Sequence, residues 1–302
     1  MKRSKVVRLA TLAAVAATSA VGQAVPPSER AASVPDFSGI WWHPSLPGIE
    51  PLASGPTSLT NRMRRPDGPS DYNALVGDYT NPILQPWAAE VVKKHGELSI
   101  AGVVYPNPAN QCWPEPGTFI YKNFALQIVQ QPDRITLLYE QDHEVRRVRM
   151  NQPHPAQVTP SWYGDSVGHY EGDTLVIDTV GIRTDRPYAM LDLYGTPYTE
   201  SLHVVERYRL LDYDAAKEGL ERDEKENFRP PGANIDIDRD YRGKHLQVHF
   251  TVEDEGVFTT PWSATITYRR GSTEWPEIVC AENPQVYYDK DTDVPTASKP
   301  DF

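Results

Sequence analysis

Charged and apolar side chains are mixed in the segment 200–208, which reads Glu-Ser-Leu-His-Val-Val-Glu-Arg-Tyr. On an extended strand, successive side chains point to opposite faces, so His203 and Arg207 would share one face. Glu206 and Tyr208 would share the other face. A strand with one buried face and one solvent-exposed face would place apolar residues on the first and charged residues on the second. In this segment, both faces carry apolar and charged residues. The pattern predicts polar groups inside a β structure, as either a catalytic set or a buried hydrogen-bonded network.

Two other segments supply groups that suit acid–base chemistry. His154 stands between two prolines after an expected strand over 145–150, in a loop where a histidine can exchange protons near neutral pH. Either Asp165 or Glu206 would orient a histidine. The strand over 145–150 also places two consecutive arginines on opposite faces. We expect one of them to face inward and to hold a carboxylate of the protein or of a ligand.

The predicted site therefore has a catalytic set and a substrate-binding set. The sequence has 7 Trp and 16 Tyr, and aromatic walls with a few polar groups suit a small aromatic or apolar molecule. The catalytic set is His203, His154, Asp165 and Glu206. The substrate-binding set is Arg146, Arg147, Tyr139, Trp162 and Tyr208.

The sequence predicts no cofactor and no metal site. His245 and His249 share a strand face, but four residues along a strand span about 13 Å, too far to ligate one metal ion. A site assembled from distant histidines such as His43, His154 and His203 stays open, although no spacing supports it. The segment 164–168 matches the Gly-x-Ser-x-Gly pattern of serine hydrolases. That pattern requires a helix after the serine, and a β-hairpin is expected here, so we do not predict Ser166 as a nucleophile.

The N-terminal segment 1–24 has the order of a secretory signal peptide: basic residues, the apolar run Leu9–Val21, and small residues before a cleavage site at Ala24. The apolar run is too short to span a bilayer, so we expect a periplasmic or secreted protein with no membrane span after cleavage. The segment holds four of the 30 basic residues and none of the 41 acidic ones, so its removal changes the net charge from −11 to −15. Such a surface repels nucleic acid, and the expected partner is a small molecule. The oligomeric state is not predicted.

The remaining chain predicts an all-β domain. The two cysteines, Cys112 and Cys280, lack metal-binding spacing and should form a disulfide in an oxidising compartment. A flexible leader is expected over 25–36, a single β-barrel domain over 37–285, and a tail over 286–302. Within that domain, 43–118 reads as an insertion of Pro-rich loops and one short helix over 82–96. From residue 119 the hydrophobic period is 2, with short polar turns and a charged excursion over 212–240 that starts as a helix. We predict an antiparallel meander that closes as a barrel.

Two resemblances to known families extend these expectations. Gly39-Ile40-Trp41 is similar to the Gly-x-Trp signature of lipocalin-like barrels, which implies that Trp41 closes one barrel end under an arginine, Arg269 or Arg270. Longer blocks resemble a widespread family of exported bacterial proteins without an assigned reaction. These blocks are Trp-x-Gly-Asp-Ser-Val-Gly at 162–168, Glu-Gly-Asp-Thr-Leu-Val-x-Asp-Thr at 171–179, and Glu-x-Leu-His-Val-Val-Glu-Arg at 200–207, with outlying blocks at the two cysteines. The second resemblance implies a shared fold from about residue 37 to 283 and no particular reaction.

These observations favour an exported enzyme that acts by histidine and carboxylate chemistry on a small molecule in a barrel cavity. A lyase, an isomerase or a hydrolase would fit. Two alternatives remain. A lipocalin-like binding protein would have the cavity without the acid–base pair, and an envelope structural or interaction protein would have a filled barrel.

Overall fold

A computed structural model describes most of the chain from residue 34 onward. It covers 34–44, 50–51, 55–115, 117–122, 125–140, 144–185, 189–226, 238, 240–271, 280, 286–287 and 290–291. The expected signal peptide, most of the leader and most of the tail lie outside these residues. Those three expectations therefore stay predictions.

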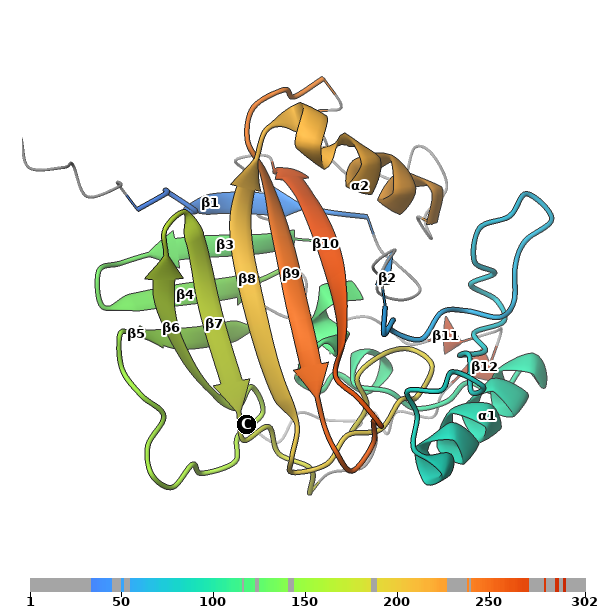
Figure 1. The fold of residues 1–302 in the computed structure, drawn as a ribbon. Helices are drawn as coiled ribbons and strands as arrows, with labels where there is room; N and C mark the ends of the chain where they lie inside the picture. The colour runs from blue at the N-terminus through green and yellow to red at the C-terminus, as the bar shows by residue number, and fades with distance from the viewer. Residues whose placement is uncertain are drawn as a thin grey trace, which may run out of the picture. The chain divides into compact units, whose positions relative to one another are not determined.

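The fold is mostly β and is built around a closed barrel of nine strands (Figure 1). Each barrel strand pairs with the next in chain order, and β1 pairs with both β3 and β10, which closes the barrel. The barrel strands are β1 (Gly39–Trp42), β3 (Ala125–Gln130), β4 (Arg134–Tyr139), β5 (Val145–Met150), β6 (Asp165–Glu171), β7 (Thr174–Val180), β8 (His203–Leu211), β9 (His245–Glu253) and β10 (Trp262–Arg270). The short strand β2 (Glu50–Pro51) also pairs with β10, and β11 (Val286–Tyr287) pairs with β12 (Lys290–Asp291). The predicted barrel is confirmed.

The barrel is mixed rather than antiparallel, which corrects the prediction of a simple meander. All its pairs are antiparallel except β5 with β6, where Val148 lies opposite Ser166 in a parallel pair. A parallel pair needs a crossover connection of about a dozen residues or more, and the Pro-rich connection 151–164 supplies it. His154 and Trp162 lie in this crossover.

The described residues contain two α-helices, where the sequence predicted one short helix over 82–96 and a helical start within the charged excursion 212–240. The first, α1 (Pro86–Ile100), begins and ends later than the expected 82–96. Pro86 fits the first helical turn, where its missing N–H costs nothing. Gly96 lies inside the helix and does not end it. A Cβ at this position would lie 2.8 Å from the Val76 side chain, so the glycine serves to give room for packing.

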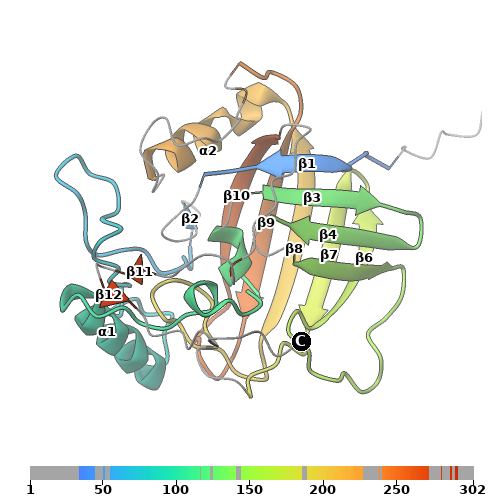
Figure 2. The same cartoon turned by 180° about the vertical axis from the view of Figure 1, so that it is seen from behind.

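The second helix, α2 (Tyr213–Glu226), extends the helical start that was expected within the charged excursion. Its buried residues include Ala216, Leu220 and Asp223, and this face packs on β10 and β9. In Figures 1 and 2, α2 lies beyond the end of β8 beside β10. Two short 3-10 helices, η1 (Ala109–Gln111) and η2 (Phe119–Lys122), follow α1.

Trp41 and Arg270 meet where β1 joins β10. The Arg270 guanidinium carbon lies 4.9 Å from the Trp41 ring centroid, and Arg270 donates a hydrogen bond to the Ser38 carbonyl at 2.8 Å. A Cβ on Gly39 would lie 2.3 Å from this guanidinium, and Gly39 has a φ of 123°. Only glycine fits there, which explains the Gly-x-Trp spacing. Of the two candidate arginines, Arg270 is the one that stacks on Trp41.

The predicted disulfide between Cys112 and Cys280 is present, with a Cα–Cα distance of 5.4 Å. It joins the segment after η1 to the chain that follows β10. Cys112 itself adopts a left-handed conformation with a φ of 52°. The disulfide therefore fixes the chain a few residues upstream of η2.

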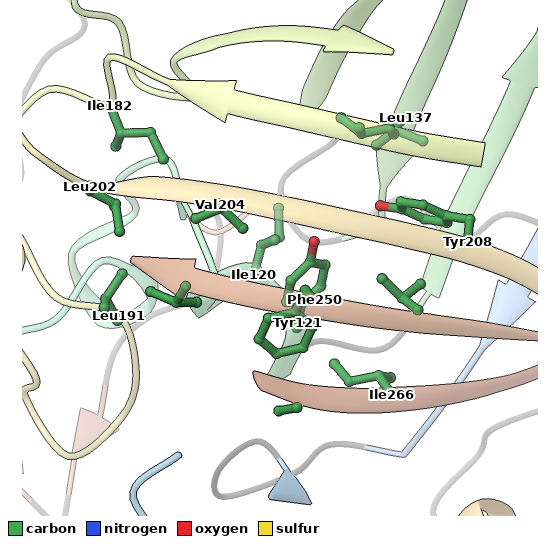
Figure 3. Packing of buried hydrophobic residues seen from close by; sticks show 14 of the residues in the cluster. Ile120, Tyr121, Leu137, Ile182, Leu191, Leu202, Val204, Tyr208, Phe250 and Ile266 are labelled. Carbon is green, nitrogen blue, oxygen red and sulfur yellow. The ribbon is translucent and has the colours of Figure 1, made fainter. Parts of the chain in front are cut away.

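Side chains fill the barrel interior (Figure 3). Strands contribute inward residues such as Leu137, Tyr208, Phe250 and Ile266, each at most 1% exposed. Ile120 and Tyr121 enter from η2 and pack among them. A cavity of about 10 Å³ remains beside Tyr121, close to the minimum for one water molecule. The interior is therefore a packed core in this structure.

Candidate functional site

Several titratable side chains gather on the outer face of the barrel where β6 to β9 begin or end. Asp165 is the first residue of β6, His203 is the first of β8, and Glu253 is the last of β9. Asp178 lies near the end of β7. The register pairs His203 with Glu253 and places these strand ends side by side, at the lower ends of β6 to β9 in Figure 1. His154 reaches the group from the crossover.

These five side chains form an alternating row that we call the histidine–carboxylate chain: Asp165, His154, Asp178, His203 and Glu253. His154 Nδ1 lies 2.6 Å from Asp165 Oδ1, and its Nε2 lies 3.0 Å from Asp178 Oδ1. His203 Nε2 lies 3.0 Å from the same Asp178 oxygen, and its Nδ1 lies 3.3 Å from Glu253 Oε2. The side chains of His154 and His203 are 24% and 31% exposed, so solvent reaches both rings.

The number of protons on each imidazole decides how this chain works. A neutral imidazole has one N–H, whereas each of these rings faces a carboxylate with both nitrogens. Both contacts of one ring are hydrogen bonds only when that ring is an imidazolium that donates from Nδ1 and Nε2. A neutral ring would keep one of its two hydrogen bonds and turn a lone pair toward the other carboxylate, so loss of a proton weakens one contact of that ring.

The electrostatics favour a proton on His203. The hydrogen bond with Asp178 raises the pKa of His203 above its ordinary value, partial burial opposes this, and Glu253 adds a smaller upward shift. The hydrogen bond from His203 in turn lowers the pKa of Asp178. At the other end, Arg149 donates to both oxygens of Asp165, at 2.5 and 3.0 Å, and lowers the pKa of that carboxyl.

Replacing Asp178 with Asn is expected to lower the pKa of His203, because it removes the largest upward shift. A folded-state pKa raised above the unfolded value of about 6.5 stabilises the fold below that pH, and this stability is lost as the pH rises through the folded pKa. The Tm difference between wild type and D178N should therefore be larger at pH 6 than at pH 9. NMR titration of the histidine ring signals measures the pKa directly. An unchanged His203 titration in D178N would show that the pair is not coupled.

A second polar group lies inside the barrel, on β5, β6 and β8, with Tyr121 added from η2. The Arg146 guanidinium donates to both oxygens of Glu206, with Nη1 2.9 Å from Oε1, and its Nε donates to Ser166 at 3.0 Å. The hydroxyls of Tyr208, at 2.8 Å, and Tyr121 donate to Glu206 Oε1. Glu206 is completely buried, which raises the pKa of its carboxyl, while the Tyr208 hydrogen bond lowers it. Sequence reasoning anticipated an inward arginine paired with a carboxylate, and Arg146 is that residue.

The predicted site residues thus separate into two groups on opposite sides of one sheet. The alternation of side chains explains this, because Asp165 points outward while the next residue, Ser166, points inward. The outer group holds His203, His154 and Asp165. The inner group holds Glu206, Arg146, Tyr139 and Tyr208. Arg147 is exposed outside the barrel, and Trp162 is half-buried, with the Arg183 guanidinium 4.9 Å from its ring centroid.

Sequence reasoning missed Asp178, Glu253 and Arg149. Asp178 had a readable signal, since it is a carboxylate after three apolar residues in the strand 174–180. Glu253 had none, because its meeting with His203 depends on the register of β8 against β9. Arg149 reaches Asp165 across the parallel pair that was not predicted.

The fold and the outer group define a mixed nine-stranded barrel with a solvent-facing histidine–carboxylate chain at one end. Comparisons with family models, with curated proteins and with solved structures found no match. The two family resemblances therefore stay predictions. In the part of the chain that the structure describes, no group of three or more His, Cys, Asp or Glu side chains is arranged to hold a metal ion. No helix in that part has the length and apolar character needed to cross a membrane.

Proposed function

We propose that this protein is an enzyme that uses the histidine–carboxylate chain for general acid–base catalysis on a small molecule. The observation that carries the proposal is the alternation of two imidazoles with three carboxylates at hydrogen-bond distances, on a face open to solvent. A positioned acid or base contributes about 10²–10⁴-fold to a reaction rate. The site is on the outer face of the barrel rather than in the cavity that the sequence suggested.

Each residue has a role that follows from its contacts. His203 is the proton carrier, since its Nδ1 makes the longest contact of the chain, 3.3 Å to the half-exposed Glu253. A substrate atom replaces that contact and exchanges a proton with Nδ1. Asp178 holds the Nε2 proton of His203 and fixes the ring orientation, as the carboxylate does in a catalytic triad. His154 and Asp165 keep Asp178 in place from the other side.

The proposed location is the periplasm or the medium. The disulfide between Cys112 and Cys280 supports an oxidising compartment, and the basic–apolar–small order of residues 1–24 supports export. A hydrolase, a lyase or an isomerase remains the expected reaction class. Each of these reactions needs the protein to supply only proton transfers, which the histidine–carboxylate chain can provide.

A second candidate is an envelope structural or interaction protein without catalysis. The packed barrel interior favours it, because nearly all of the lumen is occupied by the chain's own side chains. In that case the histidine–carboxylate chain would stabilise the strand ends only.

The test compares the purified wild type with His203→Gln and His154→Gln. Native mass spectrometry of protein from its own host, followed by chromatographic product analysis with the compound found, supplies the substrate. We expect His203→Gln to lose about 10²–10⁴-fold in kcat/KM. The matched control is His169→Gln, which removes an exposed histidine–carboxylate pair on β6. His169 does not belong to the histidine–carboxylate chain, so this variant should keep the wild-type activity. Full activity in His203→Gln would refute the catalytic role of His203. If the wild type itself turns over no compound, the structural or interaction protein is favoured.

A further inference from the structure

The barrel interior contains an aromatic ring that does not come from a barrel strand. Tyr121 belongs to η2, in the connection before β3, and its side chain is 1% exposed within the lumen. Figure 3 shows its ring beside Phe250 and below Tyr208, and the centroids of the Tyr121 and Phe250 rings are 4.9 Å apart. The strands therefore enclose a slot of the size of a phenol ring, and an inserted segment fills it.

The slot also recognises the hydroxyl of that ring. The Tyr121 hydroxyl donates to Glu206 Oε1, while Arg146 and Tyr208 hold the same carboxylate in position. A hydrogen bond to a buried carboxylate is stronger than one between neutral groups. An apolar slot that ends at a fixed carboxylate is complementary to a phenol and discriminates against a ring without a hydroxyl.

The slot carries further polar groups beside a small cavity. The cavity of about 10 Å³ next to Tyr121 is lined by Arg146, Glu206, Tyr139 and Tyr163, among others. Tyr139 is 3% exposed, and its hydroxyl lies near the Arg146 guanidinium, while the buried Tyr163 hydroxyl lies near the Glu144 carboxyl. Two buried hydroxyls beside a small cavity leave room for a polar substituent on the ring of a ligand.

Side chains, rather than backbone pairing, hold η2 in the barrel. Within the described residues, the backbone N–H of Tyr121 bonds to Thr118 of the same segment, and no backbone hydrogen bond joins 118–121 to a barrel strand. The Thr118 hydroxyl donates to the Leu191 carbonyl at 2.8 Å. Withdrawal of the Tyr121 ring therefore leaves the strand pairing intact.

We propose that the barrel interior is a binding site for a phenolic small molecule, and that the Tyr121 ring occupies this site in the structure described here. An incoming phenol takes the place of the Tyr121 ring and donates its hydroxyl to Glu206. The site uses the inner group of residues and does not depend on the proposed chemistry of the outer face.

The experiment measures the binding of p-cresol and of toluene to the full mature protein by isothermal titration calorimetry and thermal shift. Toluene is the matched control ligand, because it has the same ring and methyl group without the hydroxyl. The variants are Tyr121→Phe, which keeps the ring but loses its bond to Glu206, and Tyr121→Ala, which empties the slot.

The wild type should bind p-cresol at least about tenfold more tightly than toluene, since only p-cresol satisfies the buried carboxylate. The affinity for p-cresol should rise from wild type to Tyr121→Phe to Tyr121→Ala, as the competing side chain is weakened and then removed. If Tyr121→Ala does not fold, the comparison of wild type with Tyr121→Phe still decides. Equal affinity for the two ligands, or binding by Tyr121→Ala with none by the wild type, would overturn the proposal.

Discussion

Replacing Arg146 with methionine is expected to lower the free energy of unfolding by about 3–5 kcal/mol, because it leaves the buried Glu206 carboxylate without its cation. The Glu206 side chain is completely buried and the Arg146 side chain is 9% exposed, so water cannot substitute for the lost partner. Urea denaturation followed by tryptophan fluorescence measures the change. The matched control is Arg147→Met on the same strand, which should change the stability by no more than about 0.5 kcal/mol, as exposed positions usually do.

Two further measurements separate an unpaired charge from lost packing. The double variant Arg146→Met/Glu206→Met should recover much of the stability, since no buried charge remains. Burial raises the pKa of Glu206, so the folded Arg146→Met protein should bind a proton at this carboxyl at a higher pH than the unfolded chain does. The Arg146→Met protein should therefore gain stability as the pH falls through the folded-state pKa of this carboxyl, which is about 8 in the wild type, toward the unfolded value of about 4.3. A double variant no more stable than Arg146→Met would show that packing, rather than charge, dominates.

Removing the disulfide in Cys112→Ser/Cys280→Ser should cost about 4–5 kcal/mol, the value that the loop-entropy model assigns to a very long closed loop. The two cysteines are 168 residues apart, so the bond strongly restricts the unfolded chain. Thermal unfolding of the variant, compared with the wild type with and without a reducing agent, measures the effect. The reduced wild type should match the variant. If all three unfold at the same temperature, the unfolded chain is compact enough that the bond adds little.

The barrel could be predicted because each strand has its own local signal. Period-2 alternation and turns such as Glu171-Gly172-Asp173 are written in a few consecutive residues, and the β6–β7 hairpin followed from them. The parallel pair of β5 and β6 has no such local signal, because it results from the direction in which the crossover 151–164 returns. The end of α1 was misplaced because Gly96 was taken as a helix stop. Its role is to let Val76 pack closely, and such a tertiary contact has no signal in the local sequence.

The candidate site was predicted in part, for a related reason. Residue types and loop position singled out His154 and His203, and Asp165 was expected to orient a histidine. The sequence of residues 200–208 does not show which face of this strand points into the barrel, since both faces carry charged side chains. Strand register then decides that Glu206 faces Arg146 inside and that His203 meets Glu253 outside. Pairing across strands far apart in sequence is the information that a single segment lacks.

The seam between β1 and β10 has a consequence for how the chain matures. Trp41 lies opposite Arg270, so the first barrel strand finds its second neighbour only after nearly the whole polypeptide is available. Until then, both the leading strand and the latest strand to form expose unpaired backbone groups, which are templates for aggregation. A chain shortened before Trp262 would keep two open edges rather than form a smaller barrel. Chains that end before β10 should therefore accumulate as insoluble protein.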